Sequence, residues 1–131
     1  MAKEIIQTPN APAPIGPYNQ ATKVGNTVYG SGQIAIDPAK GDLADCVGKD
    51  IKAETKQVMD NMSEVLKAAG ATFEDIVKCT IFVSDMGNFV AINEVYGQYF
   101  NEETAPARET VEVAGLPKGV NVEISFTAVI G

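Results

Sequence analysis

Between residues 50 and 69 the chain carries an apolar pattern that is typical of a helix with one buried face. The residues that recur at three- and four-residue intervals are Ile51, Thr55, Val58, Met62, Val65, Leu66 and Ala69. This spacing places them on one side of an α-helix, with Asp50 as a candidate N-cap and Gly70 as a stop. A helix that is apolar on one face needs a second layer, and we expect that layer to be a sheet.

Strand patterns on both sides of this helix supply the sheet. Residues 75–85 are rich in β-branched side chains, which favours a strand, and the apolar spacing of residues 88–100 predicts a second helix. Gly25 and Asn26 separate two short strand-like runs, which predicts a tight hairpin. In the second of these runs, glycines 30 and 32 flank a serine. Glycines inside a strand indicate either a bulge with tight packing or the close approach of a ligand, and both interpretations stay open.

Near the C-terminus, two alternating runs, 108–114 and 120–130, flank the letters AGLPKG, and we expect them to form another hairpin. The full order is then ββαβαββ, which favours one α+β domain over residues 1–131, with a mixed, mostly antiparallel sheet and two helices on one face. Residues 7–18 hold four of the seven prolines, so an ordered loop that ends at Tyr18 is expected there.

Composition restricts the partners. Of the 131 residues 45% are hydrophobic, enough for one core, and the net charge of −7 opposes binding to nucleic acid. No apolar run approaches the ~20 residues of a membrane span, and the first ten residues lack the apolar region of a secretory signal. We therefore expect no nucleic-acid partner, no membrane association and a cytoplasmic location.

Catalytic options are also restricted. The chain has no histidine and two cysteines, Cys46 and Cys79, so the usual metal ligand sets and the usual imidazole base are missing. We expect no metal and no cofactor. Cys79 lies in the apolar run 77–83, where a thiol behaves as a small hydrophobic side chain. Neither a cysteine nucleophile nor a structural disulfide is favoured.

Arg108 is the only arginine beside nine lysines, and it opens the first run of the expected C-terminal hairpin. In our register one hairpin face is core, and the other carries Arg108, Thr110, Glu112, Glu123, Ser125 and Thr127. A planar guanidinium suits bidentate capture of a carboxylate or phosphate. The alternative is a solvated face whose arginine makes an ordinary surface ion pair with Glu109 or Glu112.

Several motifs together resemble the RidA family of enamine/imine deaminases. They cover nearly the whole chain in the family's order: APIGPY at 13–18, SGQIAIDP at 31–38, AAGATFEDIVKCTIFVSDM at 68–86, NEVYGQYF at 93–100, PARETVEVAGLPKG at 106–119 and VEISFTAVI at 122–130. The resemblance implies a homotrimer of chorismate-mutase-like α+β subunits with clefts between subunits. It also implies hydrolysis of 2-imino acids to 2-keto acids and ammonia.

The same resemblance assigns site residues. The carboxylate-binding arginine falls on Arg108, with Ala107 and Thr110 beside it as substrate-binding residues. The catalytic glutamate falls on Glu123 and the site tyrosine on Tyr18. Two more substrate-binding residues, Ser31 and Gly32, are expected to line the same cleft. The chain departs from many relatives in two places: Thr110 stands where they have cysteine, and Gly115 where they have a second arginine, which leaves substrate preference open.

The implied chemistry suits a chain without histidine. An imine carbon is already electrophilic, so a held substrate, a positioned water and a proton shuttle are sufficient. One difficulty follows from our register, in which Thr127 lies opposite Arg108 and Glu123 is about 13 Å away at ~3.3 Å per residue. A three- or four-carbon substrate cannot bridge that distance. Either the hairpin bulges or two chains combine their residues.

Three other function classes remain open. A non-enzymatic regulatory protein that binds small carboxylates or keto acids would need Arg108 but not Glu123. A ribonuclease or translation inhibitor fits poorly with the negative net charge and the absence of histidine. A chaperone-like role that rests on exposed apolar surface is the third.

Overall fold

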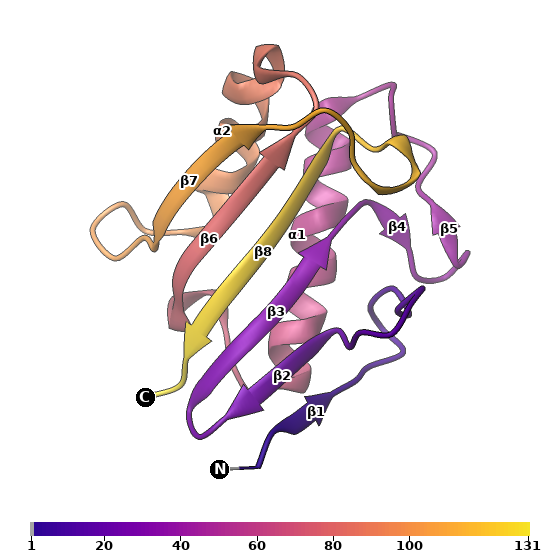
Figure 1. Cartoon of the computed structure of the whole chain (residues 1–131). Coiled ribbons are helices and arrows are strands. Elements are labelled where there is room, and N and C mark those ends of the chain that lie inside the picture. Colours follow the sequence, from indigo (N-terminus) through magenta and orange to yellow (C-terminus); the bar gives the residue numbers. More distant parts are fainter. Residues whose placement is uncertain (1) are drawn as a thin grey trace.

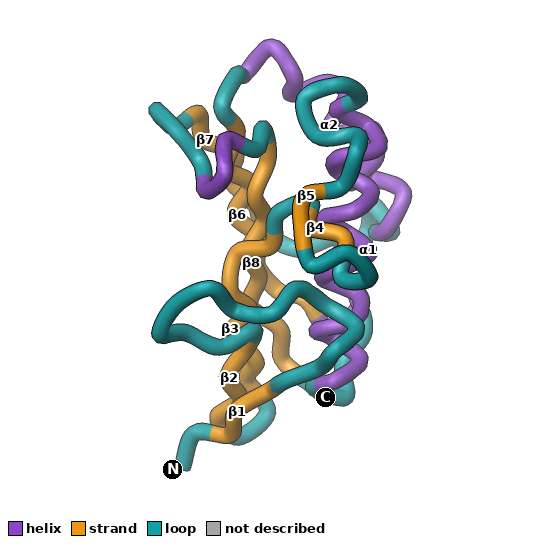
Figure 2. Tube along the Cα trace, turned by 90° about the vertical axis from the view of Figure 1, so that its right-hand side faces the viewer, coloured by secondary structure: helices purple, strands orange, loops and turns teal. Residues whose placement is uncertain are grey.

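The computed structural model describes residues 2–131 and shows a six-stranded sheet with both helices on one face (Figure 1). The sheet order is β1-β2-β3-β8-β6-β7, and only β6 and β7 run parallel. The strand bounds are β1 Glu4–Ile6, β2 Ala21–Val24, β3 Thr27–Gln33, β6 Ile76–Val83, β7 Ala107–Glu112 and β8 Val122–Val129. The side view separates the helix layer from the strands (Figure 2). The expected single α+β domain with a mixed sheet is therefore confirmed.

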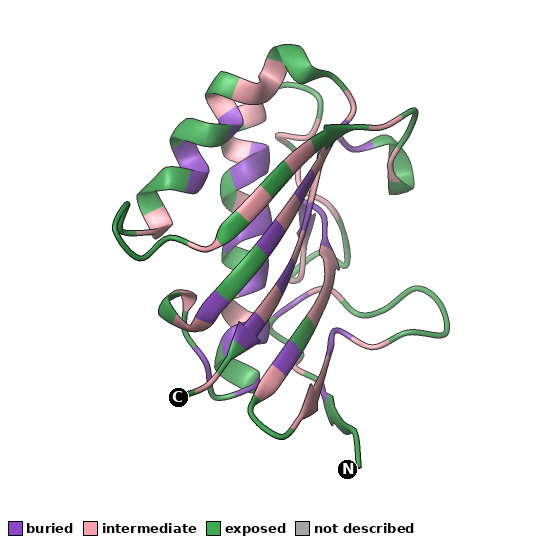
Figure 3. Ribbon diagram, turned by 60° about the vertical axis from the view of Figure 1, so that its left-hand side comes forward, coloured by how far each residue is buried: buried purple, intermediate pink, exposed green. Residues whose placement is uncertain are grey.

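Helix α1, Ile51–Ala68, matches the prediction closely. Asp50 caps it by accepting hydrogen bonds from the backbone N–H groups of Lys52 and Ala53, and Gly70 follows the end of the helix at a φ of +79°. Its buried side chains pack with those of β3, β6 and β8 in the main core. Figure 3 shows the matching alternation of buried and exposed bands along the central strands. The pattern of residues 50–69 thus encodes the layer that covers the sheet.

Other elements differ in extent from the expectation. The second helix, α2, covers only Phe89–Tyr96 and is followed by a 3₁₀ turn, Gly97–Tyr99. The predicted hairpin at Gly25 is present between β2 and β3. The pattern did not indicate the edge strand β1 or the small two-stranded sheet of β4, Ile36–Asp37, and β5, Asp42–Leu43. Among residues 2–131, neither α1 nor α2 combines the length and apolar character that crossing a bilayer requires.

The predicted C-terminal hairpin is wrong. Strand β6 lies between β7 and β8, pairs with β7 in parallel and with β8 in antiparallel orientation. The link between them holds Lys118 and Gly119 in the left-handed region, at φ 56° and 70°, and buries Val120. It carries the chain over the end of β6 to its other side. A central strand needs a partner on each side, and this tertiary pairing overrides the local hairpin pattern.

The register of β6 reverses part of our face assignment. Arg108 pairs with Cys79 and Glu123 pairs with Phe82, three positions further along the same strand. Because side chains alternate along a strand, an odd separation puts the two residues on opposite faces of the sheet. Arg108, Thr110 and Glu112 thus belong to the helix-covered face, whereas Glu123, Ser125 and Thr127 belong to the uncovered face.

Candidate active site

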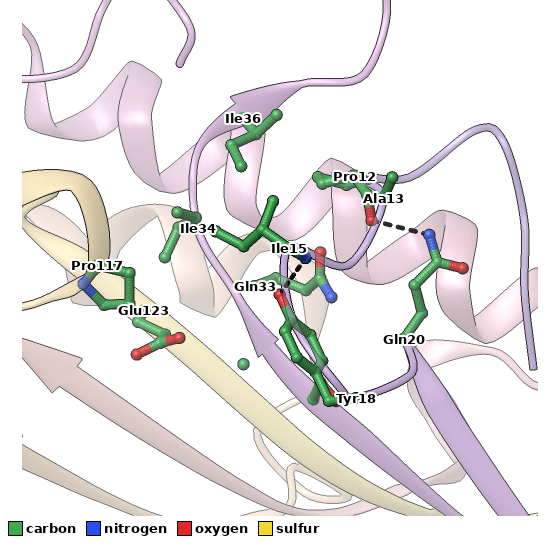
Figure 4. Close-up of a pocket in the computed structure, with 12 residues that line it drawn as sticks. Pro12, Ala13, Ile15, Tyr18, Gln20, Gln33, Ile34, Ile36, Pro117 and Glu123 are labelled. Carbon is green, nitrogen blue, oxygen red and sulfur yellow. Dashed lines mark hydrogen bonds between the residues drawn. The ribbon is translucent and has the colours of Figure 1, made fainter. Parts of the chain in front are cut away.

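A pocket of about 350 Å³ brings together four of the residues predicted from the sequence: Tyr18, Ser31, Gly32 and Glu123. It opens where β3 and β8 meet the proline-rich loop (Figure 4). Its other lining residues are mostly apolar: Pro12, Ala13, Ile15, Gln20, Gln33, Ile34, Ile36 and Pro117. The pocket therefore has one titratable carboxyl group against a largely apolar wall.

Glu123 is the acid–base candidate of this pocket. Its carboxylate projects from β8 toward the loop (Figure 4), and burial alone raises the pKa of the carboxyl group above its usual value. Gly32 makes room for it, because a Cβ atom at that position would lie 2.5 Å from Glu123 Oε2. The absence of a side chain at residue 32 is thus a steric requirement of the carboxylate. The second strand glycine, Gly30, instead packs tightly against the Phe126 ring.

The loop and β3 form the other polar part of the pocket. The Tyr18 hydroxyl accepts a hydrogen bond of 3.4 Å from the backbone N–H of Ile15, and the tyrosine side chain is partly exposed at the mouth of the pocket. Ser31 Oγ donates to the Asn19 carbonyl at 2.6 Å, which ties β3 to the end of the loop. The Tyr18 hydroxyl acts only as an acceptor in this bond and can still donate its own proton to a ligand, whereas the Ser31 hydroxyl already donates to a structural partner.

Arg108 lies outside this pocket, against α2. Its Nη1 donates to Asn93 Oδ1 at 2.7 Å, and its guanidinium lies over the rings of Tyr96 and Phe89, at 5.0 and 5.7 Å from their centroids. The two rings and the amide fix the plane of the guanidinium while leaving several of its N–H groups free. A guanidinium held in one plane has the geometry that a planar anion such as a carboxylate can pair with.

The remaining predicted residues lie near Arg108 and also outside the pocket. Thr110 shares its face of β7, and its hydroxyl is buried without a hydrogen-bond partner among residues 2–131. Ala107 is exposed and points to the uncovered face, beside Lys78. Within one chain the predicted site is thus divided into a glutamate half and an arginine half.

Asn93 is a site residue that our sequence analysis missed. It follows Phe89 by four residues and precedes Tyr96 by three, so all three lie on one face of α2 below Arg108. A polar residue inside the apolar stripe of a helix was the available signal. The apolar wall at Ile34, Ile36 and Pro117 had no comparable signal, because it depends on how loops pack.

Neither cysteine lines the pocket with Glu123, and Cys79 lies next to Arg108 on the neighbouring strand β6. Both are free thiols, and Cys79 is buried beside Tyr96, where burial raises the pKa of the thiol. A buried thiol with a raised pKa is a poor nucleophile.

Comparison with known proteins decides the family. The family model described as Endoribonuclease L-PSP matches residues 8–130, which is nearly the whole chain. The chain belongs to the RidA family.

Relatives within the RidA family match over their full lengths. The chain is 47% identical over 131 residues to a 2-iminobutanoate/2-iminopropanoate deaminase of Capra hircus, covering 100% of this chain and 93% of the relative. Among solved structures, RidA from a Psychrobacter species is 42% identical with a TM-score of 0.90, covering 97% of this chain and 99% of the other. E. coli TdcF with bound serine is 40% identical with a TM-score of 0.89, covering 98% and 99%.

Proposed function

We propose that the protein hydrolyses reactive 2-imino acids, such as 2-iminopropanoate and 2-iminobutanoate, to 2-keto acids and ammonia. The names of the mammalian relatives support this reaction. The serine bound to E. coli TdcF supports a site for a small molecule with a carboxylate next to a nitrogen-bearing carbon. The observation that carries the proposal is Glu123, a partly buried carboxyl group with a raised pKa in a mostly apolar pocket.

Each site residue has one task in this mechanism. Arg108 grips the substrate carboxylate through two parallel N–H bonds. Glu123 accepts a proton from a water molecule as the water oxygen bonds to the imine carbon, and the C=N electron pair moves to nitrogen. The proton on Glu123 then passes to that nitrogen, which gives a carbinolamine. Glu123 next takes the proton of the carbinolamine hydroxyl and passes it to the same nitrogen, while the C=O bond forms, the C–N bond breaks and ammonia leaves the 2-keto acid. Tyr18 hydrogen-bonds the imine end of the substrate or covers the pocket.

We further propose that two copies of the chain complete each site, in a homotrimer. Arg108 and Glu123 lie on opposite faces of one sheet, so a small substrate cannot touch both within one chain. The unpartnered Thr110 hydroxyl beside Arg108 supports a contact there with a ligand or a second copy. The uncovered sheet face also exposes large apolar side chains, Tyr29 at 53% and Val111 at 38%, as subunit contacts do before assembly.

The test is release of ammonia and pyruvate from freshly generated 2-aminoacrylate, the enamine tautomer of 2-iminopropanoate, with and without the protein. The parent is expected to accelerate it, and Glu123→Gln is expected to approach the spontaneous rate. A parent that binds 2-oxobutanoate but does not accelerate hydrolysis would favour the carboxylate-binding alternative.

One finding bears on the ribonuclease alternative. The family model's description names an endoribonuclease, but a net charge of −7 and a chain without histidine do not suit cleavage of RNA. The cytoplasmic location stays a prediction.

A further inference from the structure

The buried amide of Gln20 organises the proline-rich loop. Gln20 is only 3% exposed, and its Oε1 accepts a 2.7 Å hydrogen bond from the backbone N–H of Thr8. Its Nε2 lies within hydrogen-bonding distance of three carbonyls, those of Thr8 at 3.0 Å, Ala11 at 3.3 Å and Pro12 at 2.9 Å. One side chain therefore ties together both ends of the segment from residue 8 to residue 12 (Figure 4 shows its bond to Pro12).

The loop needs this outside support because it lacks donors of its own. Four prolines between residues 7 and 18 remove backbone N–H groups. Beyond residue 12 the loop holds itself with two local bonds, from Ile15 N–H to the Tyr18 hydroxyl and from Tyr18 N–H to the Gly16 carbonyl. We call Gln20, together with residues 8–12 that its side chain bonds, the clamp. The carbonyl of Gln20 in turn accepts from the Ser31 N–H at 3.0 Å, and this bond anchors the clamp to β3. The loop is thus bonded to the sheet at its C-terminal end, through the Gln20 carbonyl and through the Asn19 carbonyl that accepts from Ser31 Oγ, and residues 8–12 are connected to this end through the Gln20 side chain.

This loop is one wall of the pocket that contains Glu123. Pro12, Ala13, Ile15 and Tyr18 line the loop side, opposite Ile34, Ile36 and Pro117. Gln20 also lines the pocket and is bonded to this wall at the Pro12 carbonyl, whereas Glu123 is carried by β8. Moving the loop changes the width of the pocket without moving the carboxylate.

We propose that Gln20 is a positioning residue, which sets the distance between the loop wall and Glu123 and so fixes how tightly the pocket holds a substrate side chain. The inference rests on the proposed deaminase function. It assigns Gln20 no contact with the reacting atoms. Substitution of Gln20 is expected to raise KM more than it lowers kcat. The rise in KM is expected to grow with the length of the substrate side chain that touches the wall.

Two substitutions test the role from different directions. Gln20→Met keeps the length of the side chain and removes every hydrogen bond, whereas Gln20→Glu keeps the acceptor for Thr8 and replaces the donors with a second oxygen. The matched controls are Gln98→Met and Gln98→Glu, at an exposed glutamine on the turn after α2, outside the pocket. Hydrogen exchange, steady-state kinetics and thermal unfolding are measured for all four variants and the parent.

Both Gln20 variants are expected to speed amide exchange in residues 8–19 while the amides of α1 keep their protection. The KM for 2-iminobutanoate is expected to rise about tenfold, in line with the cost of misplacing a substrate-positioning group by a fraction of an ångström. The rise is expected to be smaller for 2-iminopropanoate, which has one carbon less to touch the wall. The pH profile of kcat, set by Glu123, stays that of the parent, and the Gln98 variants match the parent throughout.

Three results would overturn the proposal. Parent-like exchange and KM in both Gln20 variants would show that the loop holds its position without the clamp. A fall in kcat with an altered pH profile would place Gln20 in the chemistry. Global unfolding of both variants would make Gln20 a determinant of the fold. An inactive parent refutes the proposed function instead, and exchange together with 2-oxobutanoate binding then still tests the clamp, because neither requires turnover.

Discussion

Glu123 is held where its negative charge costs stability. Burial raises the pKa of its carboxyl group in the folded chain above that of the unfolded chain, so the folded state binds the proton more tightly. The contribution of Glu123 to the free energy of unfolding is then largest at acid pH, where both states are protonated, and falls as the pH rises through the raised pKa. A group that destabilises the fold in its charged form is a candidate for function.

Glu123→Gln should therefore separate stability from activity. Glutamine keeps the size of the side chain and never ionises, so the variant is expected to melt at a higher temperature than the parent at pH 7. The difference should shrink toward pH ~4, near the usual pKa of glutamate. Deaminase activity should fall by ~10² to 10⁴, the typical contribution of a positioned acid–base group. Thermal unfolding at several pH values and ammonia release measure the two effects, and equal melting curves at all pH values would contradict the cost of the buried charge.

Arg108→Lys probes the other half of the site. Lysine keeps the charge but loses the planar fork that Asn93, Phe89 and Tyr96 hold in place. Affinity for the unreactive 2-oxobutanoate is expected to fall by ~1.5 to 3 kcal/mol, the range for a hydrogen bond to a charged group. Calorimetric titration checks this, with Lys78→Arg as a control for a basic side chain on the neighbouring strand. Unchanged affinity would remove Arg108 from the binding site.

At the scale of elements, local patterns predict an element where one segment decides the outcome, and they fail where two distant segments compete. Helix α1 needs only its own apolar face and its cap at Asp50, and both are visible in the sequence. The order of β6, β7 and β8 depends on which strand β6 accepts on each side, and no spacing within 108–130 records that choice. The candidate site shows the same difference between local and distant information. Sequence motifs identified Glu123 and Arg108, but their placement on opposite faces of the sheet follows from the strand order.

The first turn of α1 offers a matched pair of substitutions. The buried Glu54 carboxylate accepts from the backbone N–H groups of Gly48 and Asn121 and from the Asn121 side chain, and so fixes the entry to β8. Glu54→Ala removes a fully buried carboxylate and its three hydrogen bonds, so a loss of ~3 kcal/mol in unfolding free energy is expected, since a hydrogen bond to a charged group is worth ~1.5 to 3 kcal/mol. Asp50→Ala removes an exposed cap and should cost ~1 kcal/mol. Urea unfolding of both variants measures the difference, and equal losses would show that the Glu54 contacts carry no special weight.

At the scale of the whole molecule, the two halves of the proposed site lie on opposite faces of the sheet. Arg108 projects from the edge strand β7 toward α2, and Glu123 lies in the pocket beside the proline-rich loop. Sequence periodicity describes which face of one sheet a residue takes, but it contains no information about the residues of a neighbouring copy. The interpretation that two chains combine their residues thus depends on assembly, and it has a direct test.

Mixing two inactive variants should restore activity if each site takes Arg108 from one copy and Glu123 from another. In a ring that combines Arg108→Ala and Glu123→Gln chains, an intact site forms wherever an unchanged arginine meets an unchanged glutamate. Random mixing gives this combination at about a quarter of the sites, whatever the number of copies in the closed ring. The two variants are co-expressed, or unfolded and refolded together, and ammonia release is compared with that of each variant alone.

The control is a chain that carries both substitutions and is mixed with the parent. Under the same geometry, mixed rings of these two chains also keep about a quarter of their sites intact, which shows that mixed rings form. Activity of the first mixture no higher than the mean of its two inactive components would mean that sites are not shared between copies, and the proposed division of labour between Arg108 and Glu123 would then be wrong.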